Sequence, residues 1–353
     1  MNIKNLLIEL FSIFLTIANP TPGQPSISSP KAVIYPEITL SSLFQEQDYM
    51  INDPSNQIIT LITTGDVIPA RSVNFKMTGY NDFTYPFKKT TAFLKDADLT
   101  LINLEAPLIE NCPVTNEGMI FCGNQRFIEG LKFADIDVAT IGNNHALNYG
   151  FDGLSQTVRL LETNGIAFAG FPQNGLSNLS VKEVKNKKIG FLAYNILDNP
   201  DNDIILSEIR NARNYADFLI VAYHWGAEYT NYPANETVKL AHLTIDSGAD
   251  LVVGNHPHWI QPVEIYKDKL IIYSHGNFIF DQEWSSQTKT GILTKISISN
   301  NKIIAARFYP VFISDFSQAE LLAGSKKEEI ISLLKVLSQN HAQTLLENKK
   351  ELN

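Results

Sequence analysis

Residues 251–258 read LVVGNHPH, an apolar run that ends at a glycine and is followed by histidines at alternate positions. A short apolar run bounded by Gly254 is typical of a buried strand. In open α/β sheets, ligands bind beyond the carboxyl ends of the strands. The stretch therefore predicts a strand whose end presents the imidazoles of His256 and His258 to one metal ion.

Four other stretches repeat this pattern of an apolar run followed by side chains that bind metals or protons. They end in Asp66, in Asn103 and Glu105, in Asn144 and His145, and in His224 with Glu228 nearby. Taken singly, an aspartate after a glycine is usually a turn residue, and a lone histidine is more often a core residue. Because four of the seven histidines occupy such strand ends, we expect them to converge into a site for one or two Mn, Fe, Zn or Co ions.

The remaining three histidines test this interpretation. His242 lies among the apolar positions of a predicted helix, which favours a structural role, and His341 lies in a predicted terminal helix without an evident partner. His275 follows another apolar run, so it either lines the same site or belongs to the core. Both interpretations of His275 stay open at this point.

Apolar runs alternate with amphipathic stretches from residue 57 onward, which indicates an α/β fold with much of its sheet buried on both faces. Helical spacing of apolar residues predicts helices over 152–164, 235–247 and 326–346. Asn-rich turns predict hairpins within 181–194 and 291–308. Mixed sheets are therefore favoured over a purely parallel one. The predicted strands are 59–64, 99–103, 138–141, 166–170, 189–194, 218–223, 251–253 and 270–273.

The N-terminal residues 1–27 predict a signal peptide or a weak membrane anchor. Lys4 precedes an apolar run over 6–18, which is shorter than the roughly 20 residues that span a bilayer and is interrupted by Glu9. We therefore expect an extracytoplasmic protein that is secreted or membrane-associated. Residues 28–57 are rich in proline and serine and predict a linker with a short strand at 31–35.

Composition limits the possible partners and the compartment. The net charge of -9 argues against a nucleic-acid-binding face, so positive charge for an anionic substrate must come from a metal or a local pocket. Cys112 and Cys122 lie ten residues apart in a stretch with Pro and Gly, which is consistent with a disulfide in an oxidising compartment. Two unpaired thiols in a cytosolic protein are the alternative.

The motifs, taken in order, resemble those of the bacterial capsule-synthesis (CapA) proteins, relatives of the calcineurin-like metallophosphoesterases. They are GDV at 65–67, NLE at 103–105, GNNHALNYG at 142–150, HWG at 224–226, GNHPHWIQPVE at 254–264 and YSHGNFIFD at 273–281. The resemblance covers residues 58–315 and leaves 316–353 as a C-terminal helical extension. It implies a metallophosphatase-like four-layer α/β sandwich of two mixed sheets flanked by helices. It also implies a role in making an anionic envelope polymer such as poly-γ-glutamate.

The resemblance also implies a role for each matching residue. Asp66 and His258 would hold one metal, and Glu105 would bridge to a second. The second metal would be held by Asn144, His224 and His256, and His145 would be the general acid. The sequence departs from the phosphoesterase pattern at Ile68, where a further histidine ligand is usual, and from the capsule-synthesis pattern at Asn148 and His275.

Two functions follow. The favoured one is a metal-dependent hydrolase or transferase that cleaves an ester or amide of an envelope polymer or its precursor through a metal-activated water, with Asp66, Glu105 and His145 as catalytic residues. The alternative is a non-catalytic membrane-associated scaffold, or a polymer-binding subunit of a capsule export machine that contacts membrane biosynthesis proteins. The candidate substrate-binding residues are Arg71, Asn103, Trp225, Glu228 and His275.

Overall fold

The computed structural model describes residues 37–45, 57–171 and 178–351, all of which belong to a compact unit spanning Tyr35–Asn353. The expected signal peptide or anchor, the strand expected at 31–35 and most of the expected linker lie outside the described residues. No helix within the described residues is long and apolar enough to cross a bilayer.

The larger sheet has eight strands in the order β16-β15-β14-β1-β2-β5-β6, with β13 also paired to β1. Strand β1 runs parallel to β2 and β13 and antiparallel to β14, so the sheet is mixed. Its strands are β1 (Ile59–Val67), β2 (Leu99–Leu104), β5 (Val138–Thr140), β6 (Ala167–Ala169), β13 (Asn277–Ile279), β14 (Thr290–Ser299), β15 (Lys302–Ser314) and β16 (Gln318–Leu321).

The second sheet has six strands in the order β11-β12-β10-β9-β8-β7. Its four central strands are parallel, and both edge strands are antiparallel to their neighbours. The strands are β7 (Ser180–Val184), β8 (Lys187–Asn195), β9 (Phe218–His224), β10 (Leu251–Asn255), β11 (Val263–Tyr266) and β12 (Lys269–Ile272).

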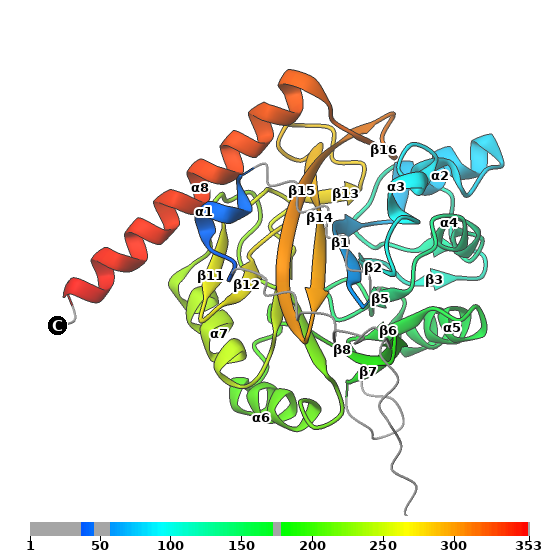
Figure 1. Ribbon diagram of the computed structural model, residues 1–353. Helices are drawn as coiled ribbons and strands as arrows, with labels where there is room; N and C mark the ends of the chain where they lie inside the picture. Colours follow the sequence, from blue (N-terminus) through cyan, green and yellow to red (C-terminus); the bar gives the residue numbers. More distant parts are fainter. Residues whose placement is uncertain (1–36, 46–56, 172–177, 352–353) are drawn as a thin grey trace, which may run out of the picture. The chain divides into compact units, whose positions relative to one another are not determined.

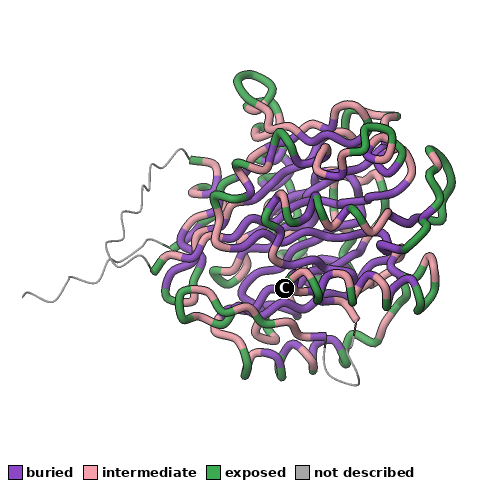
Figure 2. The backbone as a smooth tube through the Cα atoms, turned by 90° about the vertical axis from the view of Figure 1, so that its right-hand side faces the viewer, coloured by how far each residue is buried: buried purple, intermediate pink, exposed green. Residues whose placement is uncertain are grey.

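Alternation along the strands builds four layers, and the predicted sandwich is confirmed. Leu61 of β1 and Phe191 of β8 belong to the cluster between the sheets, whereas Ile62 belongs to the cluster under the helices of the larger sheet. These helices are α2 (Arg71–Tyr80), α3 (Thr91–Leu94), α4 (Phe127–Phe133) and α5 (Gly150–Thr163). Helices α6 (Asn202–Ala212) and α7 (Asn235–Asp246) cover the second sheet (Figure 1). Figure 2 shows the buried residues running through the strands and the exposed ones in the outer turns.

Two further helices contact β15 of the larger sheet and β11 at the edge of the second sheet. Helix α8 (Gly324–Glu351) contributes Leu334 to the cluster between the sheets, and its Ser338 hydroxyl accepts the backbone N–H of Val263 at 3.0 Å. The short α1 (Leu40–Leu43) contributes Leu43 to the same cluster. Residues 37–45, which lie in the expected linker, therefore pack against the sandwich.

Candidate metal centre

The polar strand ends meet because their strands are neighbours in each sheet. Asp66 of β1 lies opposite Asn103 of β2, and Asn255 of β10 lies opposite His224 of β9. The two pairs of strands stack face to face across the central cluster of apolar side chains. Residues from four distant parts of the chain are thereby brought to one end of the sandwich.

The ligand atoms of five of the expected residues come together at this end. One group consists of Asp66, Glu105 and His224, and the other of Glu105, His256 and His258, with all ligand atoms of a group within 4.8 Å of one another. Glu105 belongs to both groups, which is where a bridging carboxylate would lie. All five side chains are buried.

Asp66 is held in place by its neighbours. The Asn103 amide donates to its Oδ1 at 2.8 Å, and the His258 Nδ1 lies 3.1 Å from its Oδ2. Burial alone would raise the pKa of Asp66, but the hydrogen bond and charge of His258 and the amide of Asn103 hold that pKa well below its usual range. Asp66 is therefore an ionised carboxylate in an almost dry site.

Asn277 fixes the orientation of His258. Its amide nitrogen donates to Gln282 Oε1 at 3.0 Å and to the Thr288 carbonyl at 2.8 Å, so its oxygen is the atom that faces His258 Nδ1 at 2.9 Å. His258 Nδ1 must be the donor to this oxygen, which leaves Nε2 as the ring nitrogen that is free to bind a cation. Asn277 was not among the predicted site residues, although it lies within the quoted motif at 273–281.

Glu105 and His224 are in the opposite situation. Burial and the adjacent charge of Asp66 raise the pKa of Glu105 well above its usual range. Burial and the neighbouring His256 lower the pKa of His224 well below its usual range. Both groups are pushed toward their neutral forms here, and a cation between them would favour the carboxylate and the neutral imidazole together.

Four of the buried side-chain atoms that have no hydrogen-bond partner among the described residues lie in the candidate metal centre. They are Glu105 Oε1, Asn144 Oδ1, His224 Nε2 and His256 Nδ1. Leaving such a group unpaired costs about 1–3 kcal/mol, and these atoms belong to residues of the predicted ligand set. Their mixture of oxygen and imidazole nitrogen suits Mn, Fe, Zn or Co. The residues therefore fit a divalent cation.

The loop after β10 is also strained. His256 has φ 97° and His258 has φ 58°, a backbone region that residues other than glycine and asparagine rarely adopt. Such strain is retained when the surroundings hold a functional arrangement. Here it turns both imidazoles toward the ends of β1 and β2.

His145 lies at the edge of the centre and is ordered by a disulfide-closed loop. Cys112 and Cys122 are joined, and Phe121 of this loop places its ring 4.1 Å from the imidazole of His145. Asn148 Oδ1 accepts the backbone N–H of Phe121 at 2.7 Å and lies 3.0 Å from His145 Nδ1. His145 Nδ1 must then carry a proton, and burial lowers the pKa of this histidine.

Two of the candidate substrate-binding residues border the centre. Arg71 forms an ion pair with Asp281, lies 4.7 Å from the ring of Phe121 and has a buried Nε without a hydrogen-bond partner among the described residues. Glu228 is exposed, and its charge acts on Glu105 and His256. Both remain candidates for contact with a substrate.

The structure buries three of the residues that were expected to bind substrate, namely Trp225, His275 and Asn103. Trp225 is completely buried, and its indole N–H donates to the Tyr273 carbonyl at 2.9 Å. His275 is also completely buried and lies 2.9 Å from the Thr63 hydroxyl. Asn103 is 2% exposed and lies beneath Asp66, so it positions a ligand rather than a substrate.

Asn143 supports the site and was not among the predicted site residues. Its amide donates to Asn103 Oδ1 at 3.1 Å and to the Leu104 carbonyl at 2.9 Å, which ties the loop after β5 to β2. It precedes Asn144 in the sequence, but its inward orientation could not be inferred from spacing.

Comparison with known proteins places the chain in a family. The sequence profile described as "Bacterial capsule synthesis protein PGA_cap" matches residues 60–282, which contain every predicted ligand. The chain belongs to the PGA_cap family. This membership confirms the resemblance that the ordered motifs predicted.

Two curated relatives illustrate the similarity. The PGA_cap chain is 26% identical over 301 residues to the capsule biosynthesis protein CapA of Bacillus anthracis, covering 78% of this chain and 72% of that protein. It is 27% identical over 296 residues to the PGA biosynthesis protein CapA of Bacillus subtilis strain 168, covering 78% and 77%.

Solved structures are more distant. A hypothetical protein from Thermus thermophilus matches with a TM-score of 0.48 and 16% identity, over 71% of this chain and 98% of that one. A novel phosphatase from Mycoplasma pneumoniae matches with a TM-score of 0.46 and 16% identity, over 75% and 92%.

Proposed function

We propose that this PGA_cap protein is a metal-dependent hydrolase or transferase that acts on an anionic cell-envelope polymer, such as poly-γ-glutamate, or on its precursor. The observation that carries the proposal is the set of four unpaired, buried ligand atoms at the end of the sandwich. A structural protein would gain nothing from leaving these atoms without partners, whereas a bound cation would satisfy them together.

A divalent cation held by Asp66, Glu105, Asn144 and the three imidazoles would act as a Lewis acid on the carbonyl or phosphoryl group of a substrate. Side chains of the protein would orient the ligands and transfer the proton. Asp66 lies against His258 and helps to orient it, and the lowered pKa of Asp66 keeps the Asp66 carboxylate ionised. His145 keeps one proton on Nδ1 because of Asn148, so its Nε2 is the atom that can exchange a proton with a leaving group.

Location and partners form part of the same proposal. A disulfide beside His145 is consistent with an oxidising, extracytoplasmic compartment, where an envelope polymer and membrane biosynthesis proteins would be encountered. The two curated relatives are named for the biosynthesis of capsule and of PGA, which supports this substrate class.

One observation favours the scaffold alternative. Ile68 stands where the phosphoesterases place another histidine, and it is completely buried within an apolar cluster. The position can therefore supply no ligand, and a single metal kept for structure or recognition would suffice for a polymer-binding subunit.

Replacing His224 by alanine separates these possibilities. Metal content would be measured by elemental analysis, and activity would be screened on phosphodiesters and on γ-glutamyl polymers. We expect His224→Ala to lose metal and turnover together, while His242→Ala, a partly buried histidine outside the centre, keeps both. Undiminished metal in His224→Ala would remove the basis of the proposal. Metal-loaded wild-type protein that binds polymer and leaves it uncut would instead identify a scaffold.

A further inference from the structure

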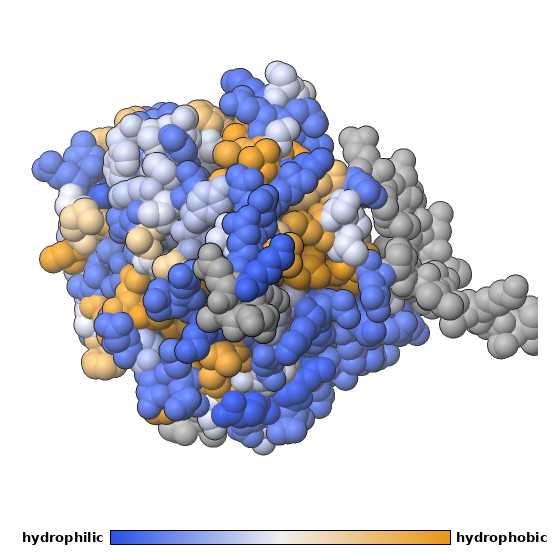
Figure 3. Space-filling model, turned by 90° about the vertical axis from the view of Figure 1, so that its left-hand side faces the viewer, coloured by the Kyte–Doolittle hydropathy of each residue, from blue (hydrophilic) through white to orange (hydrophobic). Residues whose placement is uncertain are grey.

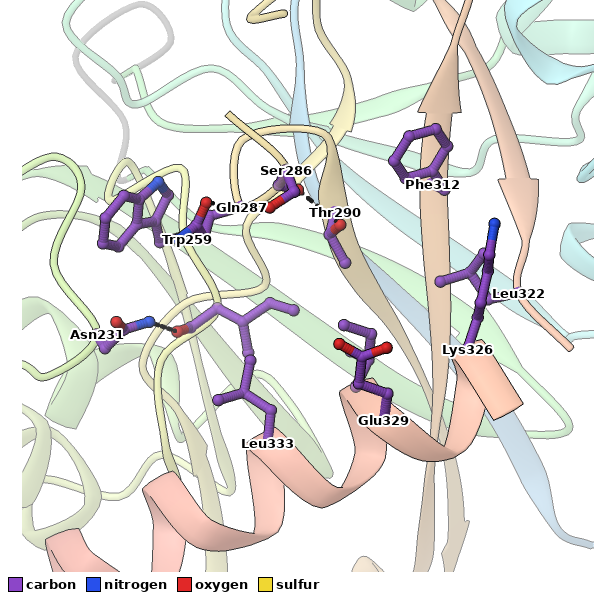
Figure 4. Close-up of a pocket in the computed structure, with 12 residues that line it drawn as sticks. Asn231, Trp259, Ser286, Gln287, Thr290, Phe312, Leu322, Lys326, Glu329 and Leu333 are labelled. Carbon is purple, nitrogen blue, oxygen red and sulfur yellow. Dashed lines mark hydrogen bonds between the residues drawn. The ribbon is translucent and has the colours of Figure 1, made fainter. Parts of the chain in front are cut away.

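A pocket of about 400 Å³ lies between α8, β15 and the loop that joins β13 to β14 (Figure 4). Its volume is in the range of small-ligand sites. Trp259 lines the pocket and directly follows the ligand His258 in the chain. Figure 3 views the side that carries α8 in Figure 1 and shows hydrophobic patches between hydrophilic side chains there.

An aromatic strip, defined as Tyr229, Trp259 and Trp284, connects the metal centre with this pocket. The Tyr229 ring lies 6.1 Å from the His258 ring, 6.2 Å from that of Trp259 and 6.0 Å from that of Trp284. Trp284 is 61% exposed. Trp284 packs edge-on against Tyr229, so its exposed face extends the aromatic surface that begins at His258 and is available to a ligand.

The pocket combines an apolar wall with a neutral, polar rim. Ile260, Phe312 and Leu333 form much of the wall, while Asn231 and Gln287 contribute amides. Both amide types carry a donor and an acceptor at once. The indole N–H of Trp259 is buried and has no acceptor among the described residues. A ligand here must therefore offer an apolar face together with hydrogen-bonding groups.

Charge separates the possible ligands. Lys326 and Glu329 line the pocket with opposite charges, and Lys289 of the neighbouring loop is paired with Glu283. No excess of positive charge is present among these described residues for a chain that carries a carboxylate on every unit. An alkyl chain would satisfy the wall but would leave the Trp259 N–H unpaired.

We propose that the aromatic strip and the pocket bind uncharged sugar units of a glycan. A sugar ring has a face of C–H groups that packs on an aromatic ring, and hydroxyls that both donate and accept hydrogen bonds. This inference rests on the proposed function and narrows its substrate from poly-γ-glutamate, which has no sugar units, to an anionic glycan whose reactive group the metal centre would receive. The anionic group of the polymer would lie at the metal, and neutral sugars would follow along the strip.

The test uses the full chain loaded with Mn²⁺ and three neutral tetrasaccharides as probes: chitotetraose, maltotetraose and mannotetraose. Binding is followed by tryptophan fluorescence and by calorimetry. We expect at least one probe to bind and Trp284→Ala to weaken it about tenfold, as expected for one lost aromatic contact. The matched control is Phe151→Ala, which removes an aromatic side chain that is 73% exposed but lies outside the strip.

Three outcomes would overturn the inference. The first is that none of the tetrasaccharides binds. The second is that Trp284→Ala binds them as well as wild type does. The third is that a γ-glutamyl tetramer or a dodecyl chain binds instead of the sugars, with the same dependence on Trp284. The same titrations on His224→Ala keep this failure distinct from that of the proposed function. If His224→Ala still binds sugar, the aromatic strip is a sugar site even when no activity is found. If the wild-type protein shows metal-dependent turnover but binds no sugar, only the inference about the aromatic strip is refuted.

Discussion

Two clusters of histidine and carboxylate occupy different parts of this molecule, and they differ in how their polar atoms are satisfied. In the metal centre, four buried ligand atoms have no partner among the described residues. In the Glu264 cluster, defined as Glu264, His242, Tyr273 and His341, the carboxylate lies 2.8 Å from His242 Nε2 and accepts the Tyr273 hydroxyl at 2.7 Å. The cluster's one unpaired nitrogen, His341 Nε2, lies 3.5 Å from Glu264 Oε2, the same distance that separates His224 Nε2 from Glu105 Oε1 in the candidate metal centre.

The histidines of the Glu264 cluster therefore have a structural role, whereas those of the candidate metal centre are available to a ligand. The Glu264 cluster joins β11, α7, α8 and the end of β12, so its members stabilise the fold by satisfying one another. Within the described residues, three ligand atoms of His, Asp or Glu converge closely enough for a metal only in the two groups that share Glu105. The convergence of several unpaired ligand atoms, rather than the presence of histidine, therefore distinguishes the candidate metal centre.

Glu264→Ala gives the largest expected effect on stability. It leaves the buried Tyr273 hydroxyl and His242 Nε2 without their acceptor, which should lower the free energy of unfolding by about 3 kcal/mol. Chemical denaturation measures the loss, and metal content should stay unchanged. A loss of metal in this variant would show that the two clusters are not independent.

Added metal is expected to stabilise the protein through the candidate metal centre and not through the Glu264 cluster. Mn²⁺ at a hundred times its dissociation constant should raise the free energy of unfolding by about 2.7 kcal/mol, because the ion binds the folded chain. Thermal unfolding with and without EDTA measures the effect, which His256→Ala should abolish. His242→Ala should be destabilised overall and yet respond to Mn²⁺ as wild type does, and an absent response would contradict the comparison.

Lowering the pH is expected to have the smallest of the three effects on stability, and we expect it to act through the Glu264 cluster. Burial alone would raise the pKa of Glu264, but the hydrogen bonds from His242, His341 and Tyr273 lower it to about 2. A lowered folded-state pKa contributes stability above the usual value near 4.5, and that contribution is lost as the pH falls through about 2. The contribution of Glu264 to the free energy of unfolding should drop by on the order of 2 kcal/mol between pH 5 and pH 2.

Glu264→Gln is the control for this pH dependence, because glutamine keeps the shape of the side chain and cannot ionise. The difference in unfolding free energy between wild type and this variant should shrink as the pH falls, as measured by urea denaturation across the range. An equal difference at pH 5 and pH 2 would place the acid sensitivity elsewhere.

The strands were the most predictable part of the fold. Each of the eight strands predicted from residue 57 onward has a counterpart, and the differences are confined to the ends, as in β1, which continues to Val67 beyond the predicted end at Thr64. Burial on both faces produces continuous apolar runs, which are easily recognised. Helices such as α4 (FIEGLKF) were not predicted, because seven residues containing a central glycine show too little periodicity.

The site was predictable in its ligands and less so in their supports. Asp66, His224 and His258 follow apolar runs, so position in the chain was sufficient to nominate them. Trp225 follows the same kind of run and is buried, because the side chains of consecutive residues point to opposite faces of a strand. Asn277 supports His258 from a separate strand, and His341 lies next to the sequence-distant Glu264, so no local pattern encodes either contact.

The amino-acid sequence by itself determined the layered fold class, the family and the residue types available for a metal, because apolar periodicity and ordered motifs are local properties of the chain. Only the tertiary structure decided which polar atoms remain unpaired. That property depends on where strands from separate sheets end, and therefore on how their packing brings Glu105, His224 and His256 together.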